Sequence, residues 1–146
     1  MEKIIINTDG GSRGNPGEGG VGVVISDARG RIIKTYGEPI GFCTNNEAEY
    51  QALILALKKV KALFGKTKLP SLDIEIRSDS ELLVKQMNGQ YKVLDEKIQP
   101  LFLQAWNLKI DFPHIAFIAV PREHNEMANR LVNEALDNAK SAQTLF

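Results

Sequence analysis

Three consecutive isoleucines near the start of the chain constrain its fold more than any other feature. Ile4, Ile5 and Ile6 form an unbroken β-branched run within residues 3–9. A strand with one solvated face alternates apolar and polar residues, whereas a continuous apolar run is typical of a central strand that is covered on both faces. The run therefore predicts a sheet that has this strand in its interior.

The order of the other expected elements indicates an α/β fold. A glycine-rich loop at residues 10–20 is followed by a hairpin whose tight turn lies at residues 27–30. A hairpin region followed by alternating helices and strands predicts a mixed sheet with helices on its faces. We expect further strands over residues 21–26, 31–36, 72–77 and 115–120, and helices from residues 45 and 79, over residues 95–109 and from residue 125.

Two of the expected helix starts have the spacing of a capping box. In such a box an N-cap Ser or Thr is followed three residues later by Glu or Gln, and the two side chains satisfy backbone N–H groups that the helix leaves unpaired. Thr44 with Glu47, and Ser78 with Glu81, have this spacing. Both pairs therefore predict helices, the second one short and ending near Asn88.

Length and composition indicate a single domain over residues 1–146. With 43% hydrophobic and 25% charged residues, the chain has the composition of a soluble globular protein. No segment approaches the roughly 20 apolar residues of a membrane span, and the first residues hold too short an apolar run for a signal peptide. Cys43 is the single cysteine, so no intrachain disulfide can form. We therefore expect a cytoplasmic protein with no membrane partner.

The charge balance argues against a nucleic-acid partner when it is taken alone. Eighteen Lys and Arg residues offset eighteen Asp and Glu residues, so the formal net charge is zero. Many nucleic-acid-binding proteins are strongly basic. A nucleic-acid partner is favoured here only if several acids bind a metal ion, or if the basic residues cluster locally.

Three acidic residues stand where an active site could form. Asp9 and Asp79 end two expected strands, and strand ends in α/β sheets are where ligands usually bind. Glu49 precedes Leu53 by one helical turn, so it shares a helix face with apolar residues. A carboxylate directed at the core is costly unless it is protonated, paired or bound to a metal. Convergence of the three acids would favour Mg²⁺ or Mn²⁺, which prefer carboxylate oxygens.

Each acid also has an ordinary structural explanation. Asp79 could be the N-cap of the short helix, and Asp9 could be a turn aspartate before glycine. Glu49 could lie on the flank of its helix and pair with a lysine. These alternatives stay open for each acid alone, and only the joint arrangement of the three indicates a metal site.

Four sequence blocks together resemble the motifs of type 1 ribonuclease H. In chain order they are DGGSRGNPG at residues 9–17, TNNEAE at 44–49, SDS at 78–80, and PREHN through ANRL at 121–131. The blocks have the family's order and nearly its spacing, and they span almost the whole chain. The resemblance implies a ribonuclease H-like fold, which is a five-stranded mixed β-sheet flanked by α-helices.

The resemblance implies that Asp9, Glu49 and Asp79 are three of the four acidic ligands of two metal ions. The ions would be Mg²⁺ or Mn²⁺, with Asp9 bridging them. The family uses such a site to hydrolyse the RNA strand of RNA–DNA hybrids by a two-metal-ion mechanism, leaving 3′-hydroxyl and 5′-phosphate ends. Asn129 stands at the fourth position, where the family usually has Asp.

The resemblance also implies contacts with an RNA–DNA hybrid. Three asparagines would contact ribose 2′-hydroxyls in the minor groove, and a threonine would hold a phosphate of the DNA strand. Gly10, in the first motif, is also implied to contact the substrate. The implied substrate-binding residues are Gly10, Asn15, Thr44, Asn45 and Asn46.

The loop before the last helix is implied to assist catalysis. Arg122 matches the residue that a compact branch of the family uses where other members have a histidine that helps to release product. His124 lies close to the same position and is the alternative.

The chain departs from the family's pattern in three places. Asn129 keeps an oxygen but lacks the negative charge, so the second metal ion should bind more weakly and cleavage should be reduced. Glu81 occupies a position near the minor groove where the family often carries Gln. A basic, tryptophan-bearing helix that larger members insert after the third motif is missing, since residues 89–94 supply only Lys92.

The resulting hypothesis is a metal-dependent endoribonuclease that acts on RNA–DNA hybrids as a monomer, with no protein partner implied. One alternative is a hybrid-binding module whose cleavage is weakened or lost because Asn129 replaces an acid. Another is a ribonuclease H-like fold used for DNA strand transfer or junction cutting. The intact Thr44-Asn45-Asn46 block disfavours this last alternative, because those groups would contact ribose.

Overall fold

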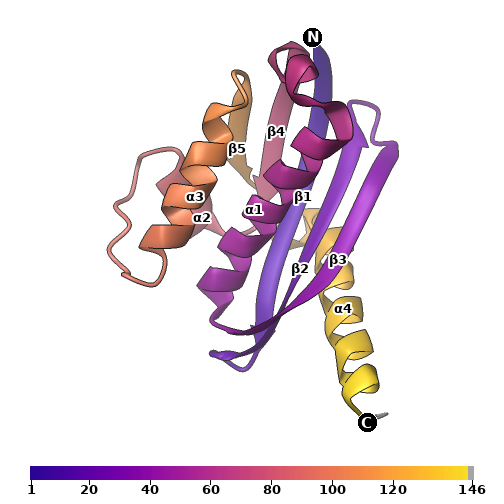
Figure 1. The fold of residues 1–146 in the computed structure, drawn as a ribbon, viewed down its shortest axis with the longest axis vertical. Coiled ribbons are helices and arrows are strands. Elements are labelled where there is room, and N and C mark those ends of the chain that lie inside the picture. The colour runs from indigo at the N-terminus through magenta and orange to yellow at the C-terminus, as the bar shows by residue number, and fades with distance from the viewer. Residues whose placement is uncertain (145–146) are drawn as a thin grey trace.

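The structure, a computed structural model, describes residues 1–144 as a five-stranded sheet with helices on both faces (Figure 1). The strands are β1 (Glu2–Arg13), β2 (Gly17–Asp27), β3 (Ile32–Cys43), β4 (Leu72–Ser78) and β5 (Ile115–Ala119). The α-helices are α1 (Asn45–Phe64), α2 (Glu81–Met87), α3 (Gln99–Ile110) and α4 (Glu126–Thr144). Two short 3₁₀ helices cover Lys66–Ser71 and Arg122–His124.

Strand β1 occupies the centre of the sheet, as the isoleucine run predicts. The strand order is β3-β2-β1-β4-β5, with β1 antiparallel to β2 and parallel to β4. Ile4 and Ile6 are fully buried in the core that includes α1, whereas Ile5 on the opposite face is only partly buried. The side-chain bonds between β1 and α4 lie farther along the strand, at Asp9 and Arg13.

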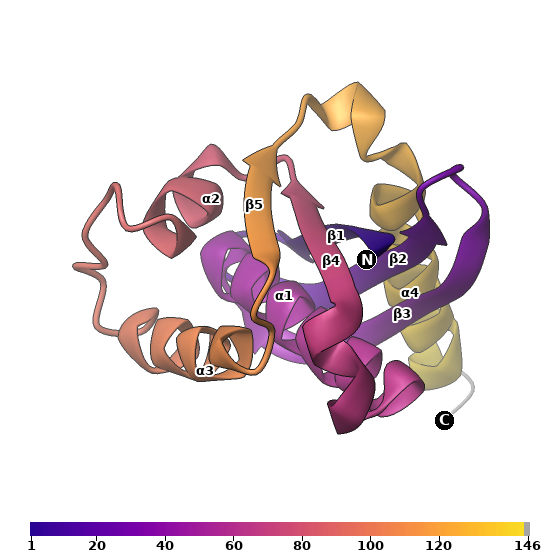
Figure 2. The ribbon, with the colours of Figure 1, turned by 90° about the horizontal axis from the view of Figure 1, so that it is seen from above.

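The two helical layers differ in size. Helices α1 and α3 lie on one face of the sheet and α4 lies on the other (Figure 2). The apolar stripe predicted for the first helix is confirmed, since Leu53, Ala56, Leu57 and Val60 are completely buried. No helix within residues 1–144 combines the length and apolarity that a membrane crossing would need.

The glycine-rich segment after Asp9 is a hairpin rather than the predicted loop. Strands β1 and β2 pair without interruption from Gly10 opposite Val21 to Arg13 opposite Glu18. Their glycines serve close packing: a Cβ atom on Gly10 would lie 2.1 Å from the carbonyl oxygen of Ala48 in α1. Glycine is compatible with a strand where another backbone approaches this closely, so counting glycines alone misassigned the segment.

The predicted helix starts are confirmed at α1 and corrected at α2. Thr44 and Glu47 form the expected capping box at α1. At α2 the N-cap is Ser80, whose hydroxyl accepts a hydrogen bond from the Leu83 amide, so the predicted box from Ser78 is wrong. Its position was misjudged by two residues because two serines compete for the same role. Helix α3 begins at residue 99 rather than 95, and its proline lies in the first turn, where no N–H is needed.

Candidate active site

Three carboxylates meet at the point where β4 ends beside β1. The parallel register pairs Thr8 of β1 with Ser78 of β4. The residues that follow them in the sequence, Asp9 and Asp79, therefore lie next to each other. Glu49 comes from the first turns of α1. Carboxylate oxygens of Asp9, Glu49 and Asp79 all lie within 4.8 Å of one another. The convergence expected from the sequence is confirmed by this geometry.

Glu49 reaches the two strand acids because α1 packs directly on Gly10. The Cβ atom that any other residue would carry there would lie 2.6 Å from the Glu49 amide nitrogen. The backbone N–H of Gly10 also donates a hydrogen bond to Glu49 Oε1, at 3.3 Å. Gly10 therefore sets the distance between helix and strand. Its expected contact with substrate stays a prediction.

The ordinary explanations for the three acids do not hold in the structure. Asp79 is not the N-cap of α2, because Ser80 has that position. Asp9 lies within a paired strand opposite Gly22, not in a turn. Glu49 forms no ion pair with a lysine among residues 1–144, and one of its oxygens is bonded to Gly10 instead. None of the three acids therefore has the local structural role considered for it, and all three are available for a shared role.

Burial and mutual repulsion raise the pKa of two of the acids. The pKa of Glu49 lies well above its usual value, first because the side chain is buried and then because Asp9 carries a like charge. Burial also raises the pKa of Asp9, and the charge of Asp79 adds to this effect. A hydrogen bond from Asn129 and the positive charge of Arg122 act on Asp9 in the opposite direction. The ionised carboxylates thus repel one another in a buried site, and a bound cation would offset this repulsion.

The donor atoms of the site fit a divalent metal ion. Glu49 Oε2 is buried and has no hydrogen-bond partner within the described part of the chain. A buried acceptor without a partner is unusual in a native structure and calls for an explanation such as an ion. Clustered carboxylate oxygens are the ligand set that Mg²⁺ and Mn²⁺ prefer. Asp9, Glu49 and Asp79 would hold the metal.

Asn129 contributes an amide to this cluster from α4. Its Nδ2 donates a hydrogen bond to Asp9 Oδ2 at 2.9 Å, while its Oδ1 accepts one from Asn133 Nδ2 at 3.3 Å. Asn129, for which the resemblance implies a fourth ligand position, therefore lies beside Asp9. In this arrangement it supplies a donor to the cluster, and its oxygen is turned toward Asn133.

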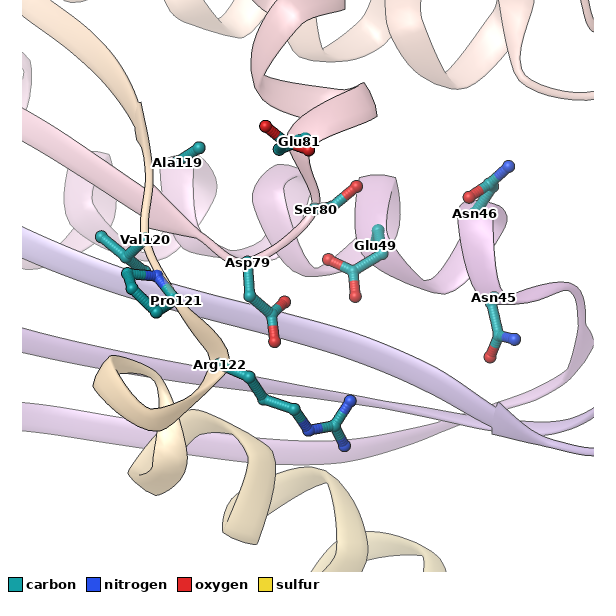
Figure 3. Close-up of a pocket in the computed structure, with 10 residues that line it drawn as sticks. All are labelled: Asn45, Asn46, Glu49, Asp79, Ser80, Glu81, Ala119, Val120, Pro121 and Arg122. Atoms are coloured by element: carbon teal, nitrogen blue, oxygen red, sulfur yellow. The ribbon is translucent and has the colours of Figure 1, made fainter.

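The acids lie where two cavities join. The larger cavity, about 590 Å³, extends along α1 and α2 (Figure 3), and a smaller one, about 290 Å³, extends toward α4. Both are lined by Asn45, Glu49, Asp79 and Arg122. The two cavities are hereafter called the cleft. Its position at the carboxyl end of β4, beside Asp9 in β1, agrees with the expectation for ligand sites in open α/β sheets.

Only one of the two candidate residues from the loop before α4 faces the cleft. Arg122 lines both cavities, and its charge acts on Asp9. His124 instead lines a separate cavity with Asn7 and Met127. The structure therefore favours Arg122 over His124 as the residue of this loop that can reach a bound molecule.

Asn15 is hydrogen-bonded to Asn45, which lines the cleft. Asn15 Oδ1 accepts a hydrogen bond from the Asn45 amide, and Asn45 Oδ1 accepts from the Ser12 amide and hydroxyl. Their side-chain NH₂ groups have no partner among the residues that the structure describes, and these donors remain for a ligand. Thr44 accepts its capping bond from Glu47, which leaves the hydroxyl proton available for donation. Asn46 is exposed and lines the larger cavity.

Sequence reasoning missed the role of Asn125, which it treated only as a helix start. This side chain is 1% exposed; its Nδ2 donates to the Thr8 carbonyl at 2.8 Å, and its Oδ1 accepts from Asn7 Nδ2 at 3.1 Å. It thereby fixes the start of α4 to the backbone directly before Asp9. Its position one helical turn before Asn129 was the available signal, because residues four apart share a helix face.

The sequence is similar to known proteins over nearly its full length. Residues 7–135 match a family model described as reverse transcriptase-like. The chain is 44% identical over 131 residues to ribonuclease HI of Halobacterium salinarum, covering 90% of this chain and 63% of that protein. It is 39% identical over 138 residues to the bifunctional protein Rv2228c of Mycobacterium tuberculosis, covering 94% of this chain. The chain spans only 36% of that relative's length.

A solved structure with the same architecture is LC11-RNase H1, isolated from compost by a metagenomic approach. The TM-score is 0.90 at 46% identity, covering 95% of this chain and 99% of that chain. The same protein in complex with an RNA/DNA hybrid aligns with a TM-score of 0.89 at 47% identity, covering 93% of this chain and 98% of that chain. The structural similarity thus extends over more than nine tenths of the chain.

Proposed function

The chain belongs to the type 1 ribonuclease H family, and from this premise we propose that it hydrolyses the RNA strand of RNA–DNA hybrids. The observation that carries the proposal is the meeting of Asp9, Glu49 and Asp79 around a buried carboxylate oxygen that lacks a partner. The structure of a relative with an RNA/DNA hybrid supports the substrate class.

The three acids would hold two Mg²⁺ or Mn²⁺ ions. When bound, such ions supply an activated water and stabilise the leaving oxygen, so that the products carry 3′-hydroxyl and 5′-phosphate ends. Asp9 accepts a hydrogen bond from Asn129 and lies close to the other two acids, so it would share in holding both ions. Glu49 accepts a hydrogen bond from Gly10, and the pairing of β1 with β4 places the backbone of Asp79 beside that of Asp9.

The edge of the cleft would bind the ribose side of the hybrid. The NH₂ groups of Asn15 and Asn45 are oriented by the bonds that their oxygens accept, and a 2′-hydroxyl can accept from such donors. Asn46 presents a further amide at the larger cavity, and the Thr44 hydroxyl can donate to a phosphate. Since DNA lacks the 2′-hydroxyl, these contacts would direct the acids to the RNA strand.

Arg122 is proposed to act on the phosphate that lies over the acids. It borders both parts of the cleft, and its guanidinium carries several donors that match phosphate oxygens. In this position it would orient the phosphate and offset part of its charge. We assign product release to Arg122 rather than His124, which lies in the other cavity.

The alternative function is a hybrid-binding module with weakened or lost cleavage. One observation favours it: Asn129 directs its NH₂ group, not its oxygen, at Asp9. An amide also lacks the charge that would attract a second ion. We nevertheless propose an active enzyme with reduced metal affinity, because a rotation of the amide exchanges its oxygen and nitrogen and because the three acids are intact.

A cleavage assay on a labelled RNA–DNA hybrid tests the proposal. The full chain is incubated with Mg²⁺ and separately with Mn²⁺, and the fragments are tested for extension from a 3′-hydroxyl. Duplex DNA and duplex RNA are compared as substrates. The variant Asp79→Asn should lower the rate about 100-fold or more, a larger effect than that of residues which only support a metal ligand. Asp73→Asn, on the same strand β4, is the matched control.

Three outcomes have distinct meanings. Cleavage of the RNA strand that depends on Asp79 and is insensitive to Asp73→Asn supports the proposal. Tight hybrid binding without fragments at any metal concentration would establish the binding module instead. Preferential cutting of duplex DNA would instead favour the alternative of DNA strand transfer or junction cutting.

Other expectations from the sequence stay predictions. They are a single domain over residues 1–146, a monomeric state without a protein partner, and a cytoplasmic location.

A further inference from the structure

Glu81 places an unpaired carboxylate on the wall of the cleft. It is the first residue of α2, it is exposed, and it lines the larger cavity together with Asp79 and Asn46. In Figure 3 it lies on the side of Asp79 that is remote from Arg122. No hydrogen bond or ion pair joins its carboxylate to another residue in the described range 1–144. The group is therefore available to a ligand.

Glu81 lies close to the reacting phosphate of any bound hybrid. It follows Asp79 by two residues, and two residues span at most about 7 Å. Successive nucleotides of a strand advance by roughly 3.4 Å along the helix axis. A base pair facing Glu81 would thus lie within about two steps of the phosphate over the acids.

The chemistry of a carboxylate limits what it can meet there. In its ionised form it only accepts hydrogen bonds, whereas a glutamine side chain both donates and accepts. The minor-groove edges of A·T pairs offer only acceptors, and a G·C pair adds one donor, the guanine 2-amino group. A carboxylate facing an A·T edge would lose water without gaining a bond, which is unfavourable.

We propose that Glu81 makes the enzyme prefer a guanine near the cleavage site by accepting a hydrogen bond from its 2-amino group. The inference rests on the proposed hybrid cleavage, and it assigns a base preference to a residue on the wall of that same cleft. The negative charge beside phosphates makes the bond important, because only a donor offsets the repulsion at this position.

Replacement of single guanines by inosine tests the proposal directly. Inosine lacks only the 2-amino group, so the major-groove edge and the backbone are unchanged. Hybrids carrying inosine at one position each, within a few steps of a mapped cut, are compared with the guanine parent. For the unaltered protein, kcat/KM at that cut should fall about tenfold at one position, the usual effect of losing one bond to a charged group.

Two variants separate the roles of Glu81. Glu81→Gln keeps the size of the side chain but adds a donor that can bond to the acceptors on an inosine edge, so its guanine-to-inosine ratio should be clearly smaller than that of the parent protein at the sensitive position. Glu96→Gln makes the same chemical change at an exposed site outside the cleft and should keep the ratio of the parent protein. Ratios are used because both variants can alter the stability of the fold or of the hybrid equally for both substrates.

Each possible outcome tests a different part of the inference. Equal rates on guanine and inosine hybrids by the unaltered protein would overturn this inference while leaving hybrid cleavage in place. An inosine effect of undiminished size in Glu81→Gln would assign the preference to another residue and would also overturn it. If a 2′-fluoro nucleotide, which lacks the hydroxyl donor, slows only the protein with Glu81 and inosine does not, the carboxylate contacts ribose and the guanine assignment is wrong. Absence of hybrid cleavage altogether would instead contradict the proposed function.

Discussion

Glu49 combines three properties that rarely occur together in one residue. Its carboxylate is largely buried, one oxygen has no partner among the described residues, and two further acids lie within 4.8 Å. Its pKa is raised well above the usual value by burial and by the charge of Asp9. In the absence of metal, Glu49 therefore binds its proton more tightly in the folded state than in the unfolded state.

This raised pKa predicts that Glu49→Gln stabilises the metal-free protein above neutral pH. A group with a higher pKa in the folded state binds more protons when folded, so its contribution to stability is lost as pH rises from the unfolded pKa through the folded one. The variant should have the higher melting temperature at pH 8 in EDTA, and the difference should shrink toward pH 4. Calorimetry at both pH values measures it, with Glu96→Gln as an exposed control. A lower melting temperature for Glu49→Gln at pH 8 would contradict the account.

Asn129→Asp should act in opposite directions with and without metal. A carboxylate there removes the donor to Asp9 Oδ2 and adds a like charge, so the metal-free protein should lose stability. It also adds a ligand, so the Mg²⁺ concentration for half-maximal cleavage should fall about tenfold, equivalent to about 1.4 kcal/mol. Titration of activity against Mg²⁺ measures this effect. An unchanged midpoint would mean that the fourth position does not contact an ion.

The sequence predicted the acids of the site and the neighbouring amide of Asn129, but not two further amides near them. Asp9, Glu49 and Asp79 were identifiable because acids at strand ends and on an apolar helix face need a common explanation. Asn125 and Asn133 were not, since their roles depend on how α4 lies against β1. A helix face indicates which residues are buried together, but it does not indicate which strand atoms they meet.

At the scale of elements, the contact between α1 and β1 determines the geometry of the site. The helix backbone lies so close to Gly10 that no side chain fits between them. The glycine-rich stretch was predicted to be a loop because glycine is depleted in strands. That statistical tendency is overridden where a helix must approach the sheet closely, which depends on the tertiary structure and not on local sequence.

Gly10→Ala should destabilise the protein and separate Glu49 from Asp9. The new methyl group would lie 2.1 Å from the Ala48 carbonyl oxygen, so α1 must move. Forced insertion of a methyl group into a packed region costs about 1–3 kcal/mol. Urea unfolding and cleavage rates should both show the loss. Gly11→Ala is the matched control, because its methyl group would meet only Asn45 Oδ1, at 3.9 Å. Equal stability of the two variants would contradict the packing argument.

At the scale of the whole molecule, metal binding and folding should be linked. The acids come from β1, α1 and the end of β4, so an unfolded chain cannot hold them together. A ligand that binds only the folded state adds RT ln(1 + [L]/Kd), which is about 2.7 kcal/mol at a hundredfold excess over Kd. For a chain of this size each kcal/mol raises the melting temperature by about 3 °C.

Calorimetry with increasing MgCl₂ or MnCl₂ should therefore give a rising melting temperature. NaCl at matched ionic strength should not reproduce the increase. Asp9→Asn should remove most of the increase, whereas Asp73→Asn should retain it. A melting temperature that is independent of both metals for the unaltered protein would mean that the cluster is not a metal site.

The architecture as a whole was more predictable than its boundaries. The isoleucine run placed β1 at the centre, and the order of hairpin and helices indicated the mixed sheet. The extension of β1 and β2 beyond residue 9, and of β3 to Cys43, followed from pairing with neighbours and had no local signal.

The site joins the first strand of the chain to its last helix through the bond between Asn129 and Asp9. During synthesis on a ribosome, Asp9 emerges long before α4, because Asn129 follows it by 120 residues. A nascent chain that stalls before α4 leaves the exit tunnel would lack both Arg122 and Asn129 beside the acids. The surroundings of Asp9 are therefore complete only after α4 has been synthesised and has packed against the sheet.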